Sequence, residues 1–169
     1  MSYLSSNQLK QYEDEGFVSP INIFSKEKAK EIRDEIELIE KEIPGELDKS
    51  GRYNAHLISP LLDEVTHHPK ILDAVQSLIG KDILVCGTTL FIKNPYEKGF
   101  VSYHQDAKYI GLEPHNWVTA WVAITDSNEH NGCMRMWSGS HKDSLKDHDQ
   151  MFNEGNLLTR GQTVNNVPK

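Results

Sequence analysis

The sequence has few cysteines, no long apolar run and no excess of basic charge, and each shortage excludes a class of protein. The two cysteines in 169 residues, Cys86 and Cys133, show no CxxC spacing, which excludes a disulfide scaffold and predicts reduced, buried thiols. No apolar run approaches the ~18 residues that a membrane span requires, and the N-terminus lacks the basic and apolar regions of a secretion signal. We therefore expect a cytoplasmic protein that makes no contact with a membrane.

The charge balance points to a small-molecule partner. Eighteen basic against 25 acidic residues give a net charge of -7, which disfavours binding to nucleic acid or to an anionic surface. Hydrophobic residues make up 37% and charged residues 25% of the chain, an ordinary globular composition. Without internal repeats or low-complexity segments, residues 1–169 are expected to form a single domain, or part of one, of unspecified oligomeric state.

Helix signals fill the first part of the chain, to about residue 80. Ser5 or Ser6 can cap a first helix that Gly16 ends, and Ser25 can cap a second that Pro44-Gly45 stops. Two short helices should follow, the second opening at Pro69. One stripe of the long second helix is apolar and should be buried against the outside of a sheet; it consists of Ala29, Ile32, Ile36, Ile39 and Ile43.

Strand signals fill the rest, about residues 81–169. β-Branched and aromatic runs alternate there with turn residues; the runs are Ile83 to Lys93, Phe100 to Asp106, Val118 to Ile124, and Cys133 to Trp137. A parallel sheet would need helices between these strands, whereas here the helices come first. The order predicts an α+β or mainly β protein, with an antiparallel sheet or barrel buttressed by N-terminal helices.

His104-Gln105-Asp106 is the first candidate for chemistry. Residues i and i+2 of a strand share a face and can present an imidazole and a carboxylate to one metal. The spacing alone is weak, because 8 His and 25 acidic residues give about one such pair by chance. The chain has two, but the second, His141 and Asp143, follows the turn composition Ser138-Gly139-Ser140, so His141 is expected to be a hydrogen-bonded turn residue.

The motifs around His104 are similar to those of a known protein family. Several motifs stand in family-like order and spacing between about residues 60 and 162; they are Phe91-Ile92-Lys93-Asn94-Pro95, Tyr103-His104-Gln105-Asp106, Val118 to Ile124, Asn131-Gly132-Cys133-Met134, Ser138 to Lys142, and Asn156 to Gln162. Together they resemble the phytanoyl-CoA dioxygenase family. The resemblance implies a double-stranded β-helix (a jelly-roll, cupin-like fold) with Fe(II) as cofactor, 2-oxoglutarate as co-substrate and O2 as oxidant.

The resemblance also assigns roles to the pair. His104 and Asp106 would be the first two metal ligands and the catalytic residues of an oxidoreductase that hydroxylates a small organic molecule. Two His and one carboxylate on one face of Fe(II) leave positions open for co-substrate and oxygen. An aspartate at 106 disfavours halogenation, because halogenating relatives have a small residue there. The competing interpretation is a hydrogen-bonded His–Asp pair without metal.

Four further residues are candidates for the co-substrate pocket. By resemblance, Leu90 contacts 2-oxoglutarate and Trp121 lies in the strand that lines its pocket. Lys93 can pair with a carboxylate, and Thr119 can donate a hydrogen bond to one. The alternative for Leu90 and Trp121 is an ordinary core position.

Two expected parts of the family pattern are missing. A second metal histidine and an arginine for the distal carboxylate of 2-oxoglutarate should follow, yet no histidine occurs after Arg160. We therefore expect the chain to be the N-terminal part of a longer enzyme, with an incomplete β-helix and little activity alone. The alternative is a non-catalytic β-helix relative that binds a small ligand or a partner.

Overall fold

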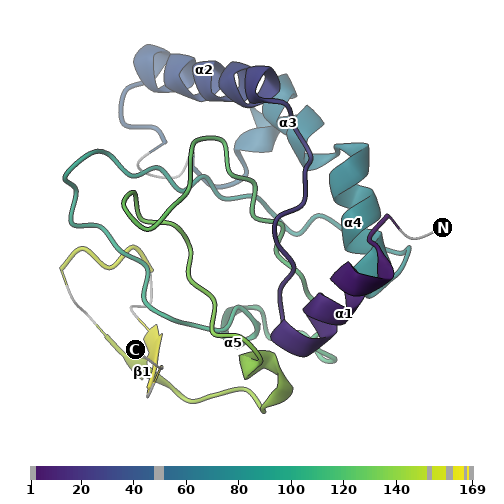
Figure 1. Cartoon of the computed structure of the whole chain (residues 1–169). Helices are drawn as coiled ribbons and strands as arrows, with labels where there is room; N and C mark the ends of the chain where they lie inside the picture. The colour runs from purple at the N-terminus through teal and green to yellow at the C-terminus, as the bar shows by residue number, and fades with distance from the viewer. Residues whose placement is uncertain (1–2, 48–51, 152–153, 159–161, 166, 168–169) are drawn as a thin grey trace. The chain divides into compact units, whose positions relative to one another are not determined.

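The computed structural model of the chain (Figure 1) describes residues 3–47, 52–151, 154–158, 162–165 and 167. The chain forms two compact units. The first contains Met1–Leu9, Ser19–Phe91 and Val118–Arg135, and the second contains Lys10–Val18, Ile92–Trp117 and Met136–Lys169.

Helix α1 spans Ser6–Glu15, and neighbouring residues set both of its ends. The Ser5 hydroxyl accepts a hydrogen bond from the Gln8 backbone N–H (3.3 Å), and the Gln8 side chain accepts one from the Ser5 N–H (3.0 Å). This reciprocal pair is a capping box. Gly16 follows with a φ of 84°, so the predicted glycine stop is confirmed.

Helix α2 spans Lys26–Glu42 and begins at the predicted cap. The Ser25 hydroxyl accepts a hydrogen bond from the Lys28 N–H at 3.2 Å. Ion pairs such as Arg33–Glu37, at 2.6 Å, line its exposed face and contribute about 0.3–0.5 kcal/mol each. The charged residues of this helix therefore form a solvated face.

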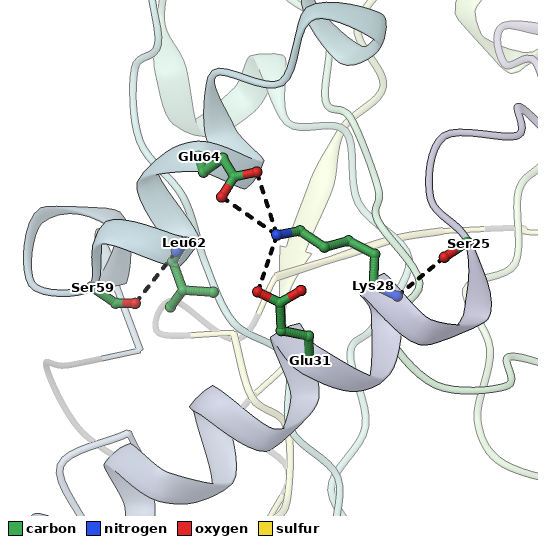
Figure 2. Close-up of polar contacts among 6 residues, drawn as sticks. All are labelled: Ser25, Lys28, Glu31, Ser59, Leu62 and Glu64. Carbon is green, nitrogen blue, oxygen red and sulfur yellow. Dashed lines mark hydrogen bonds and ion pairs between the residues drawn. The ribbon is translucent and has the colours of Figure 1, made fainter.

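Helix α3, Pro60–Thr66, packs beside α2 (Figures 1 and 2). The buried Ser59 hydroxyl caps α3 and also donates a hydrogen bond to the Glu35 carboxylate of α2 at 2.8 Å. As Figure 2 shows, Lys28 extends from α2 to Glu31 (3.2 Å) and to Glu64 of α3 (3.3 Å). One hydroxyl and one ammonium group therefore join the two helices.

The last predicted helix is α4, Pro69–Ile79, which begins at the predicted proline and ends before Gly80. A 3-10 turn, η1 (Ala55–Leu57), precedes α3. Residues 48–51, between α2 and α3, lie outside the described residues. The helical region predicted up to about residue 80 is thus confirmed for α1 to α4.

The second unit holds short elements. They are α5 (Ala107–Ile110), the 3-10 turn η2 (Ser140–Lys142), and strands β1 (His148–Gln150) and β2 (Gln162–Val164). The two strands pair antiparallel, with His148 opposite Val164 and Gln150 opposite Gln162. In the part of the chain that the structure describes, this is the only sheet.

The four predicted strand runs are not strands in the structure. Within the described residues they contain only isolated bridges, Tyr53 to Thr89 and Phe100 to Asn156. β-Branched and aromatic residues favour a pleated surface only when a neighbouring strand supplies the ladder, and Leu84 in the first run is 97% exposed. The double-stranded β-helix therefore stays a prediction, since the described residues form one two-stranded sheet, from β1 and β2.

Two burial predictions also need correction. Ile32 and Ile36 are buried as predicted, but α2 packs on α3 rather than on a sheet. Ile43 lies past the helix end and is 54% exposed. Cys86 and Cys133 are free thiols as predicted, but Cys86 is exposed. Cys86 lies in a run that forms no strand, so no neighbouring strand covers its side chain.

None of the helices in the described ranges is long and apolar enough to cross a membrane.

The first unit depends on the buried stripe of α2. We predict that Ile32→Ala lowers the free energy of unfolding by about 2–5 kcal/mol, because it opens a cavity around a side chain that has no exposed surface. Leu38→Ala, on the same helix at a position that is 45% exposed, is the matched control and should cost much less. Urea denaturation measures both, and equal losses would contradict the assigned core.

Candidate metal centre

His104 and Asp106 lie together, as the sequence predicted. The His104 Nε2 and Asp106 Oδ1 atoms are 3.1 Å apart. The local structure differs from the prediction, because His104 lies in an irregular segment and Asp106 at the turn that leads into α5. Asp106 makes no capping bond with its carboxylate, so α5 does not draw that side chain away from the imidazole.

The backbone fixes which nitrogen of His104 carries a proton. Nδ1 lies 2.8 Å from the Ser102 carbonyl oxygen, which can only accept, so Nδ1–H is the donor. Nε2 is then the nitrogen that faces Asp106. The Tyr109 ring of α5 packs edge-on against the imidazole, with centroids 5.6 Å apart and planes at 89°, and holds the orientation of the ring.

Asp106 favours the charged form of His104. Its hydrogen bond is the main cause that raises the pKa of His104 above the ordinary value of 6.5; burial opposes the shift, and the Ser102 carbonyl and the Asp106 charge add to it. The imidazole is largely covered, with 23% of its surface exposed. The hydrogen bond to Asp106 therefore stabilises the protonated form of the His104 imidazole.

The same two atoms fit a metal ion. At the ~2.1 Å distances typical of first-row divalent metals, two ligands at a right angle lie roughly 3.0 Å apart, close to the observed 3.1 Å. The Ser102 carbonyl acts on the far nitrogen, as outer-shell partners of metal-binding histidines do. Among the described residues, no group of three His, Cys, Asp or Glu side chains is arranged to hold a metal, so the pair would supply two ligands to a metal bound here.

The four predicted pocket residues are distributed over both units. Leu90, Thr119 and Trp121 belong to the first, whereas Lys93, His104 and Asp106 belong to the second. Trp121 is 45% exposed and its ring lies 5.5 Å from that of Phe91, so Trp121 is not an ordinary core residue.

The other predicted pocket positions differ in exposure. Leu90 is half-buried, and its N–H donates to the Arg52 carbonyl oxygen at 2.9 Å. Lys93 and Thr119 are exposed. Their roles toward the co-substrate stay predictions.

His141 is a turn residue, as predicted. It belongs to η2, and its Nε2 donates to the Glu13 carbonyl oxygen of α1 at 3.0 Å. A side chain on Gly16 would collide with this ring, because a Cβ there would lie 2.5 Å from His141 Nδ1. His141 therefore links η2 to the end of α1.

Sequence reasoning missed one contact beside the pair. The backbone N–H of Gln105, between the two candidate ligands, donates to His148 Nε2 at 2.9 Å. The two residues are far apart in the chain, and the contact involves a main-chain N–H, which every residue type except proline carries. No motif or spacing could have revealed it.

We predict that Asp106→Asn lowers the pKa of His104, because it removes the charge and weakens the hydrogen bond that raise it. The stabilisation from this pair is fully present below the ordinary pKa of 6.5 and is lost as the pH rises through the raised value. An NMR titration of the His104 imidazole in the metal-free chain measures the shift. Asp143→Asn, whose carboxylate pairs with Lys146, is the control and should leave the His104 pKa unchanged.

Curated relatives of the chain are dioxygenases by name. A zebrafish (Danio rerio) phytanoyl-CoA dioxygenase domain-containing protein 1 is 33% identical over 100 residues, which are 59% of this chain and 34% of the relative. The ectoine dioxygenase of Bordetella bronchiseptica is 24% identical over 82% of this chain and 50% of its own length. A probable alpha-ketoglutarate-dependent hypophosphite dioxygenase of Stutzerimonas stutzeri is 24% identical over 85% of this chain and 56% of its own.

The chain thus spans between about a third and just over half of the length of these relatives. No solved structure matches it significantly. The phytanoyl-CoA dioxygenase family model matches residues 12–165, a range that includes the His104–Asp106 pair and nearly all of the chain. The protein belongs to the phytanoyl-CoA dioxygenase family.

Proposed function

We propose that the protein is a non-haem Fe(II)- and 2-oxoglutarate-dependent dioxygenase that hydroxylates a small organic molecule, with His104 and Asp106 as two of its metal ligands. The observation that carries the proposal is the 3.1 Å separation of the imidazole Nε2 and the carboxylate Oδ1. Family membership supports the cofactor and co-substrate. The double-stranded β-helix is proposed as the fold on the same basis.

The residues of this chain prepare the ligands. The Ser102 carbonyl oxygen holds the proton on Nδ1 of His104, which directs the Nε2 lone pair toward the side of Asp106. Asp106 supplies a hard anionic oxygen that suits a divalent first-row ion. Bound iron, with 2-oxoglutarate and O2, would supply the oxidising chemistry that couples formation of succinate to hydroxylation of the substrate.

Leu90, Lys93, Thr119 and Trp121 are proposed to contact the co-substrate. Lys93 and Thr119 are exposed and carry groups that donate to carboxylates. The exposed face of Trp121 beside Phe91 supports a ligand-contacting role better than a core role. Two relatives are named for ectoine and for hypophosphite, which are small molecules of unrelated chemistry, and these names support a small substrate without identifying it.

Anaerobic titration with Fe(II) tests the site. We expect the wild-type chain to bind the metal and His104→Ala or Asp106→Ala to weaken binding by at least about tenfold, because each removes one of two described ligands. Asp63→Ala removes the carboxylate of a different His–Asp pair, in which Asp63 lies 3.0 Å from His67, and should bind like the wild type. Equal affinity of all four proteins would contradict the proposal and favour the alternative of a non-catalytic relative.

Turnover is the second test. We predict that the 169-residue chain releases succinate slowly in the presence of Fe(II), 2-oxoglutarate and O2, because its described residues supply two metal ligands and family enzymes use three. The assay follows O2-dependent succinate formation, with His104→Ala as the blank. Succinate release at an ordinary enzymatic rate, abolished in His104→Ala, would show that another residue of this chain completes the site.

A further inference from the structure

We propose that His148 is a positioning residue for the metal site, acting through the backbone of Gln105. The inference rests on the proposed function, since Gln105 lies between the two candidate ligands. His148 touches neither the metal nor a reacting atom in this proposal. It holds the main chain that carries both ligands.

Three hydrogen bonds form a closed ring around Gln105. Its N–H donates to His148 Nε2 at 2.9 Å, and its side-chain Oε1 accepts from the Lys146 N–H at 2.8 Å. His148 Nδ1 completes the ring by donating to the Lys146 carbonyl oxygen at 2.8 Å. Gln105 is therefore held at both its main chain and its side chain by the segment that leads into β1.

The ring requires one tautomer of His148. A backbone N–H only donates and a carbonyl oxygen only accepts, so Nε2 must be the bare nitrogen and Nδ1 must carry the proton. Because both imidazole nitrogens are engaged by main-chain groups, the ring of His148 has a single orientation in which all bonds are made. This leaves His148 without a lone pair for a metal and separates its role from that of His104.

Further contacts support this segment. The Lys146 ammonium lies 2.7 Å from the Asp143 carboxylate and 4.8 Å from the centre of the Trp137 ring. His148 pairs across the sheet with Val164, whose N–H donates to the Tyr103 carbonyl oxygen at 2.8 Å. Gln105 and Tyr103 are the two neighbours of His104 in the chain. The cross-strand pair thus holds both of them, Gln105 through His148 and Tyr103 through Val164.

Such support is needed because the ligand segment has no ladder of its own. Tyr103, His104 and Gln105 lie in irregular chain, so no strand ladder holds the backbone to the sub-ångström accuracy that two ligands on one ion require. Loss of an outer-shell partner typically costs 10–100-fold in metal affinity. We infer that His148 supplies this accuracy at Gln105.

Two amide substitutions separate positioning from simple packing. In His148→Gln the side-chain oxygen reaches the position of Nε2 and can still accept from Gln105, whereas in His148→Asn the amide ends near the position of Nδ1 and cannot. Both variants lose the imidazole and differ by one methylene group, so thermal unfolding should be similar. His130→Asn, at an exposed histidine of the first unit, is the matched control.

The probe is Co(II) alone, titrated into the full 169-residue chain, and the second readout is hydrogen exchange of the Gln105 amide without metal. We expect His148→Gln to bind Co(II) within about threefold of the wild type and His148→Asn to bind roughly 10–100-fold more weakly. Exchange at Gln105 should accelerate in the Asn variant only. His130→Asn should match the wild type in both measurements.

Three results would overturn the inference. Unchanged exchange at Gln105 in His148→Asn would show that the bond does not hold this amide. Faster exchange with wild-type Co(II) affinity would show that the bond exists but does not position the ligands. If instead the wild type and Asp106→Ala bind Co(II) equally, the proposed metal site fails and His148 is only a backbone support, which distinguishes that failure from the other two.

Discussion

The candidate site depends on the hydrogen bond from His104 Nδ1 to the Ser102 carbonyl oxygen. This bond joins residues two apart in the chain, at 2.8 Å, and Ser102 is buried. It keeps a proton on Nδ1 and orients the ring so that Nε2 faces Asp106. If Nδ1 were instead the bare nitrogen, the carbonyl would lose its donor, and Nε2 would carry the proton and have no lone pair for the proposed metal.

The parts that the sequence predicted are those set by short-range chemistry. The ends of α1 and α2 follow from Ser5, Gly16 and Ser25, because caps act within one turn of the helix. The proximity of His104 and Asp106 also followed from their spacing, although the strand that motivated it is absent from the described residues. A two-residue separation keeps the side chains close in an irregular segment as well as in a strand.

The failures concern interactions between distant residues. The strand runs were identified from β-branched and aromatic residues, but a strand exists only with a partner, and at Phe100 the partner is a single bridge from Asn156. No sequence motif indicated a role for His148, since its contact is with a main-chain N–H. Residue identity predicts side-chain chemistry well and says little about which backbone groups that chemistry will meet.

The irregular backbone of the site explains why its support comes from the C-terminal residues. Buried main-chain groups need partners, and those around the ligand segment find them at Gly155, Leu157 and Val164 rather than in a sheet of their own. Asn156 adds a side-chain bond to the Ser102 hydroxyl at 3.1 Å. The residue whose carbonyl orients His104 is therefore itself held by this segment.

The space between His104 Nε2 and Asp106 Oδ1 suits either of two occupants, a proton or the proposed divalent ion. A proton between Nε2 and Oδ1 satisfies both groups at 3.1 Å, and the raised pKa of His104 reflects that satisfaction. A divalent ion needs nearly the same separation but a bare nitrogen, so it must displace the proton. The imidazole is therefore already hydrogen-bonded in the metal-free chain, and binding of the proposed metal would need little rearrangement of the two side chains.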